Sequence, residues 1–169
     1  MRRIFALSLT LLILWAVLAE LNHALSELRV YVFAGSLFVS FAAVTQPWRI
    51  GLTTALIGGL ICDANSPVRF GTHVLLFAVA HVTLANIRDR VPRDDAIAAT
   101  VLTLLTNLAL FLVFSFTQIH SSPAAPNIWP RLLMDLLCSQ IFVAGVTPWF
   151  FALQTQAVAM AQPWRGETA

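Results

Sequence analysis

The chain has 169 residues, of which 59% are hydrophobic and 11% are charged, and its formal net charge is +2. A soluble domain carries roughly 25% charged residues, so this composition excludes an ordinary soluble domain and indicates an integral membrane protein. The length leaves room for about six spanning helices of roughly 20 residues each and for little soluble mass.

Apolar runs separated by proline-containing interruptions predict six helices. Helices tend to stop before proline, and Pro47, Pro67, Pro92, Pro123 and Pro130 all lie between runs. The expected helices cover residues 4–21, 30–45, 48–63, 71–87, 96–119 and 132–161. The sequence therefore predicts an all-α fold, a polytopic six-helix transmembrane bundle that forms one domain over residues 1–169.

The first apolar run also has the pattern of a signal peptide. Arg2 and Arg3 precede it, and the small residues Ala16 and Ala19 lie near its end. We expect a retained first helix, because five more apolar runs follow. The polar residues after it, among them Asn22 and Glu27, are expected to form a solvated connection.

The third apolar run is short for a spanning helix. Ile50 to Cys62 gives 13 residues, fewer than the roughly 17 that cross a bilayer, unless Trp48 and the residues around Asp63 extend it. Helices three and four either span fully or form a re-entrant hairpin. Both alternatives leave the rest of the topology unchanged, because a hairpin that enters and leaves on one side has the same parity as two spans.

The arginines predict the orientation of the bundle, since the chain has no lysine. With the N-terminus in the cytoplasm, seven arginines lie inside and three outside, which the positive-inside rule favours. The inside set is Arg2, Arg3, Arg49, Arg88, Arg90, Arg93 and Arg165, and the outside set is Arg29, Arg69 and Arg131. We therefore expect both termini in the cytoplasm.

Cys62 and Cys138 fall near the outer ends of two expected helices. A disulfide needs Cα atoms about 4.4 to 6.8 Å apart, which sequence spacing cannot establish, so a disulfide and two separate apolar thiols both stay open. The sequence has no CxxC and no Cys and His pair with zinc spacing, so we expect no metal site.

Polar residues recur at helical spacing inside the last two apolar runs. They are Thr100, Thr103, Thr106 and Asn107 in the fifth run and Asp135 and Ser139 in the sixth. Such stripes commonly pack one helix on another, with hydroxyls bonded to a neighbour or back to their own helix. We expect helix contacts here rather than a translocation path.

The connection between the third and fourth runs carries the candidate site. Asp63 lies where the third run ends, and a carboxylate beside hydrocarbon is costly unless it reaches water, a partner or a hydrogen-bond network. Asp63, Ser66 and His73 are the residue types of a hydrolase triad, but the chain has neither GxSxG nor HExxH. We therefore expect no catalytic residues and no enzyme.

A structural interpretation fits this connection better. Asp63 caps the loop or the start of the fourth helix through backbone N–H groups, and Gly71 supplies a turn conformation that other residues rarely adopt. On this interpretation Asp63→Asn keeps most of the stability, because the amide oxygen still accepts a hydrogen bond, and Asp63→Leu lowers it. Close helix packing is expected at Gly51, Gly58 and Gly59.

These residues also carry a family resemblance. Pro47, Arg49, Gly51, Gly58 or Gly59, Asp63, Ser66, Gly71 and an apolar helix from Leu75 resemble the central signature of MreD, the bacterial rod shape-determining membrane protein. Pro148, Trp149 and Phe150 in the last helix give a second, weaker similarity. The signature covers residues 46–75, and the remainder is similar to the family in hydropathy.

The resemblance implies a non-enzymatic scaffold of the bacterial elongation machinery in the inner membrane. Such proteins bind MreC and belong to the complex that couples the MreB cytoskeleton to peptidoglycan synthesis by RodA and penicillin-binding protein 2. No cofactor, metal or nucleic acid is expected, and membrane lipids surround the bundle. We expect the third-to-fourth hairpin and the fifth-to-sixth connection to hold a segment of an MreC-like partner.

The same resemblance leaves one alternative function. The MreD fold is similar to the six-helix substrate-binding subunits of energy-coupling-factor vitamin transporters. A bundle of that kind holds a small ligand, in which case Asp63, His73 and Asp135 would line a pocket at the outer tips of the helices. Fold similarity alone does not assign that function.

Overall fold

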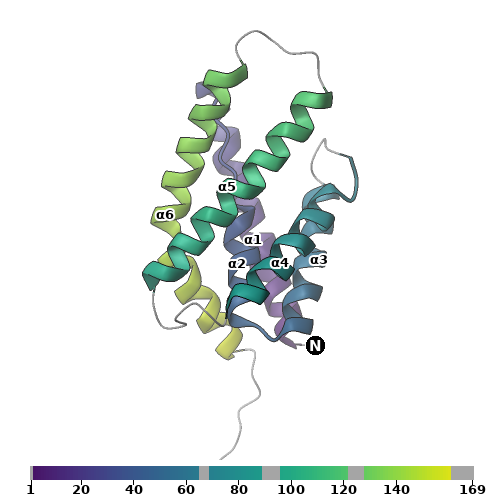
Figure 1. Ribbon diagram of the computed structural model, residues 1–169. Coiled ribbons are helices and arrows are strands. Elements are labelled where there is room, and N and C mark those ends of the chain that lie inside the picture. The colour runs from purple at the N-terminus through teal and green to yellow at the C-terminus, as the bar shows by residue number, and fades with distance from the viewer. Residues whose placement is uncertain (1, 65–68, 89–95, 122–127, 161–169) are drawn as a thin grey trace, which may run out of the picture.

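The computed structural model describes residues 2–64, 69–88, 96–121 and 128–160. Within these ranges the protein is all-helical, with no strand, and six α-helices form an elongated bundle (Figure 1). They are α1 (Arg2–Leu25), α2 (Gly35–Thr45), α3 (Trp48–Ala64), α4 (Thr72–Ile87), α5 (Ala96–Ser121) and α6 (Ile128–Met160), with a short 3-10 helix, η1 (Ser26–Leu28), after α1. The predicted six-helix fold is confirmed.

The three longest helices have the dimensions of membrane spans. Phe5–Leu28, Ala96–Thr117 and Trp129–Met160 are each long and apolar enough to cross a bilayer. Helices α3 and α4, with 17 and 16 residues, are shorter. At 1.5 Å per residue they reach about 25 Å, close to the ~30 Å of the hydrocarbon core.

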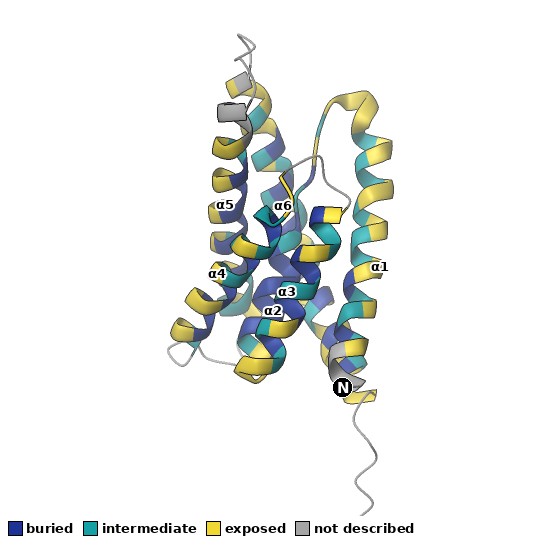
Figure 2. Ribbon diagram, turned by 90° about the vertical axis from the view of Figure 1, so that its right-hand side faces the viewer, coloured by how far each residue is buried: buried dark blue, intermediate teal, exposed yellow. Residues whose placement is uncertain are grey.

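The outer surface of the bundle is rich in exposed apolar side chains. Helix α1 shows this most clearly, because exposed residues follow one another along most of its length (Figure 2). Phe5, Ile13 and Val17 on that helix are all more than half exposed. An apolar surface of this extent is stable in lipid, so the protein is a helical membrane bundle.

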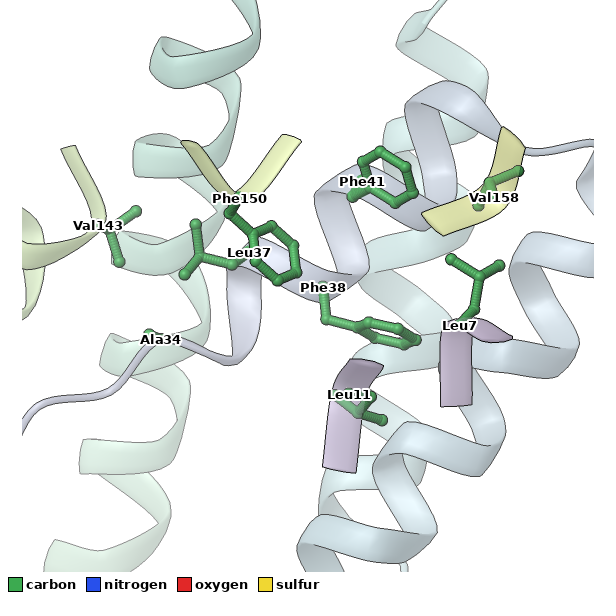
Figure 3. Close-up of a cluster of buried hydrophobic side chains, with 9 residues drawn as sticks. All are labelled: Leu7, Leu11, Ala34, Leu37, Phe38, Phe41, Val143, Phe150 and Val158. Atoms are coloured by element: carbon green, nitrogen blue, oxygen red, sulfur yellow. The ribbon is translucent and has the colours of Figure 1, made fainter. Parts of the chain in front are cut away.

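Helix α2 forms the centre of the bundle. Eight of its 11 residues are buried, as expected for a helix that is apolar on nearly all sides. One side packs with α1 and α6 in a cluster made of Leu7, Leu11, Ala34, Leu37, Phe38, Phe41, Val143, Phe150 and Val158 (Figure 3). Its other side packs with α3, α4 and α5 in a second cluster, which includes Val39, Ala55, Phe77 and Phe114.

The predicted helix over residues 30–45 is wrong at its start. Helix α2 begins at Gly35, and residues 30–34 are not helical. The sequence of this segment is rich in β-branched and aromatic residues, which favour extended backbone. The backbone N–H groups of Tyr31, Val32 and Phe33 bond instead to side chains of α1 and α6, as described below.

Helix α6 starts earlier than predicted and is not straight. It begins at Ile128 rather than at residue 132, because Pro130 falls in the first turn, where no helical N–H bond is lost. Pro148 lies inside the helix, and α6 changes direction in its second half (Figure 1). A proline that removes one helical hydrogen bond explains this bend.

Both ends of the described chain lie at the same end of the bundle. Helices α1 and α3 begin there, and α6 ends there (Figure 1). Helices α1 and α3 end, and α4 begins, toward the opposite end of the bundle. This arrangement has the even parity that the sequence predicts for six helices.

Candidate functional site

The α3–α4 hairpin positions the candidate site, and its glycines allow the two helices to pack closely. A Cβ on Gly59 would lie 2.5 Å from Val74 Cα and 2.7 Å from Val74 N, so the backbone of α4 occupies that space. A Cβ on Gly51 would overlap the ring of His81, and one on Gly58 would meet Leu11 and Phe38. Gly59 and Gly51 therefore both face α4, Gly51 also faces the Ala42 carbonyl of α2, and Gly58 faces α1 and α2.

Asp63 is fully engaged at the hairpin tip. Its Oδ1 accepts hydrogen bonds from the His73 backbone N–H at 2.9 Å and from His73 Nδ1 at 2.8 Å. Its Oδ2 accepts from the backbone N–H groups of Gly71 at 2.9 Å and Val74 at 3.2 Å. A carboxylate has about four acceptor positions, so no acceptor position of Asp63 remains for a ligand.

This geometry makes Asp63 the N-terminal cap of the neighbouring helix. The first N–H groups of a helix have no acceptor within it, and a carboxylate there also offsets the positive end of the helix dipole. Gly71 completes the turn with φ of 95°, in the left-handed region. The cap and the turn are the roles that the sequence analysis expects for these residues, whereas Ser66 lies outside the described residues.

His73 links the hairpin tip to α5. Its ring donates from Nδ1 to Asp63, because an ionised carboxylate can only accept. The same ring lies 4.4 Å from the Phe114 ring, centroid to centroid, and meets the Phe77 ring edge-on. Phe33, from the segment before α2, packs on Phe114 at 5.4 Å. The tip is therefore held against α5 by aromatic contacts.

A second set of polar side chains, from α1 and α6, holds the non-helical segment at residues 30–34. Asn22 of α1 accepts from the Val32 N–H at 2.7 Å and donates to the Val32 carbonyl at 3.0 Å. Asp135 of α6 accepts from the Tyr31 N–H at 2.8 Å, and Ser139 accepts from the Phe33 N–H at 2.9 Å. Non-helical backbone at membrane depth is stable only with such partners.

The sequence predicts helix contacts for Asp135 and Ser139, whereas both accept hydrogen bonds from the backbone of the non-helical segment before α2. Asn22 was expected in a solvated connection, yet it holds both polar groups of one backbone residue. The signal available in the sequence was an amide shortly before a run of β-branched and aromatic residues that starts at Val30. Its meaning depends on a contact ten positions away.

The remaining predicted residues lie apart from the tip. Pro148 and Trp149 are on α6, and the Trp149 side chain is 76% exposed. Cys62 and Cys138 are both free thiols, so the disulfide alternative is wrong in this structure. The hydroxyls of Thr100, Thr103 and Thr106 bond back to carbonyls of α5, as expected for residues at helix contacts.

The polar residues of the site have a structural role, because they fix backbone segments by hydrogen bonds. Asp63 and Asp135 both accept hydrogen bonds from backbone N–H groups, and His73 donates to Asp63. Among the described residues, no group of three or more His, Cys, Asp or Glu side chains is arranged to hold a metal ion. No family model, no curated protein and no solved structure matches this chain.

Proposed function

We propose that this protein is a non-enzymatic membrane scaffold of the bacterial elongation machinery, similar to MreD, that binds an MreC-like partner. In this role it supports rod shape and the regulation of peptidoglycan synthesis, next to RodA, penicillin-binding protein 2 and MreB. The protein would lie in the inner membrane with both termini in the cytoplasm. The resemblance over residues 46–75 is the source of the partner's identity.

One structural observation carries the scaffold role. The charged residues that the sequence offers as a site, Asp63 and Asp135, are used to fix backbone segments of the protein itself. Polar groups that are hydrogen-bonded to the protein's own backbone make a rigid frame. A preorganised surface binds a partner at a lower entropic cost than a mobile one.

The tip surface, defined here as Phe70 and Leu75, is the part of this frame that we assign to the partner. These side chains are 73% and 65% exposed, and they flank the capped turn at Gly71. Helix association in a bilayer depends on van der Waals packing between fixed side chains. The capped turn holds these two apolar side chains in place, and a segment of the partner would pack on them.

Co-purification from detergent tests the proposal. The chain and its tagged MreC-like protein are expressed together, and the folded chain is expected to be retained with the partner. Replacing Phe70 and Leu75 together by alanine should weaken retention about thirtyfold or more, since residues central to an interface contribute about 1 kcal/mol or more each and the two together about 2 kcal/mol or more. Val79→Ala is the control, because Val79 is 55% exposed one turn further along α4.

Two outcomes separate the function from the surface. If the folded wild-type chain does not retain the partner, the scaffold function is wrong. If wild type and the double variant retain it equally, the function stands and the partner binds elsewhere. Specific binding of a vitamin-sized ligand to the purified chain, with no retention of an MreC-like protein, would instead support the alternative of a transporter subunit.

A further inference from the structure

The junction of α2, α5 and α6 contains three buried polar atoms that lack hydrogen-bond partners in the described part of the chain. They are Asn107 Nδ2, Ser40 Oγ and Gln140 Oε1. Asn107 and Ser40 are both 0% exposed. A buried polar group without a partner costs about 1–3 kcal/mol, so three of them at one junction need a physical explanation.

Existing hydrogen bonds place the residues that carry these atoms within about one helical turn of one another along the bundle. Ser36 Oγ donates to Asn107 Oδ1 at 2.9 Å, which sets Asn107 against α2. Ser40 lies one turn after Ser36 on the same face of α2. Gln140 Nε2 donates to the carbonyl of Leu104, one turn before Asn107 on α5, at 3.3 Å.

The direction of the helices brings the remaining groups together. Helices α2 and α5 run in opposite directions (Figure 1). Because Ser36 of α2 lies opposite Asn107 of α5, the residue one turn after Ser36 lies opposite the residue one turn before Asn107. That level contains Ser40 and Leu104, to which Gln140 is bonded. The three residues therefore lie within about one turn of one another, on three helices that pack together at this junction.

Their chemistry is complementary to a single small polar molecule. The Asn107 amide nitrogen can only donate, the Gln140 amide oxygen can only accept, and the Ser40 hydroxyl can do both. Buried waters in proteins typically make about three hydrogen bonds to groups of this kind. We propose that this junction is an internal water site, in which one water accepts from Asn107, donates to Gln140 and bonds to Ser40.

The site gives the central helix a polar tie to its neighbours. Apart from this junction, α2 is held mainly by the two apolar clusters. Hydrophobic contacts are non-directional, so they do not fix the rotation of α2 about its axis. A water bonded to α2, α5 and α6 fixes the rotation of α2 between them. This inference does not depend on the proposed function.

The sign of one stability change tests the site. An unpartnered Ser40 hydroxyl would destabilise the folded protein, so in that case Ser40→Ala would raise Tm or leave it unchanged. A hydroxyl bonded to the internal water contributes to stability, so we expect Ser40→Ala to lower Tm in detergent by about 2–4 °C. Thr103→Val is the control, because Thr103 is equally buried on α5 but bonds only to its own helix.

A direct measurement decides the question even if the variants are poorly folded. In a high-resolution structure of the wild-type protein, we expect a density peak within about 3 Å of both Asn107 Nδ2 and Gln140 Oε1. Direct contact between the two amide side chains, or no peak between them, would overturn the water site. A Tm of Ser40→Ala at or above that of wild type would overturn it as well.

Discussion

At the scale of single residues, Asp63 shows why the chemistry of both carboxylate oxygens matters. Oδ1 faces two donors on His73, and Oδ2 faces the backbone N–H groups of Gly71 and Val74. An asparagine has only one oxygen, and in either orientation its NH2 group would point at N–H donors. The expectation from sequence that Asn substitutes well is therefore revised by the geometry.

We predict that Asp63→Asn destabilises the protein by about 1–3 kcal/mol, because buried donors lose their acceptor. Asp63→Leu should cost more, since it removes every acceptor at the cap. Thermal unfolding in detergent measures both, with about 2–4 °C of Tm per kcal/mol for a chain of this size. Wild-type Tm values for the two variants would mean that the cap contributes nothing.

At the scale of elements, the α3–α4 hairpin depends on backbone contact rather than on large side chains. Gly59 faces the backbone of Val74, which cannot rotate away as a side chain can. Gly145 on α6 has open space where a Cβ would stand. The two glycines lie in helices of the same bundle, yet substitution should have opposite effects.

Gly59→Ala should destabilise the protein by about 1–3 kcal/mol through overpacking between α3 and α4. Gly145→Ala should instead stabilise it by up to about 1 kcal/mol, because alanine is the better helix former. The comparison of the two Tm values in one detergent checks this pair. A decrease of the same size in both variants would show that helix propensity, not helix contact, dominates.

At the scale of the whole molecule, the buried carboxylates of Asp63 and Asp135 are hydrogen-bonded inside the bundle, and the long helices expose apolar side chains on its outer surface. The described chain pairs its buried carboxylates with backbone N–H groups, while its long helices expose leucine, valine and phenylalanine to the surroundings. The first residues of α1 and the last residues of α6 lie toward the same end of the bundle (Figure 1). We therefore predict that, in a bilayer, both termini lie on the same side.

Reporter fusions test the orientation. Green fluorescent protein fused at either terminus should fluoresce, and alkaline phosphatase fused there should be inactive, because its disulfides form only outside the cytoplasm. Fusions that report opposite sides would contradict the parity of six helices. Active phosphatase at both ends would contradict the arginine rule for this chain and leave the parity intact.

Composition and hydropathy alone determined the class of this protein, its six helices and most of their bounds. Those signals are local, because an apolar run of membrane length and the proline after it need no knowledge of the rest of the chain. The cap role of Asp63 and the turn at Gly71 were also predictable, since cap and helix start are only a few residues apart.

Only the tertiary structure decided what depends on contacts between distant residues. The start of α2 at Gly35 follows from Asp135 and Ser139, which lie more than 100 positions away in the chain and hold the segment before it. The polar junction around Asn107 likewise needs three helices in register. A backbone N–H in lipid must find a partner somewhere, and the sequence does not state which distant side chain supplies it.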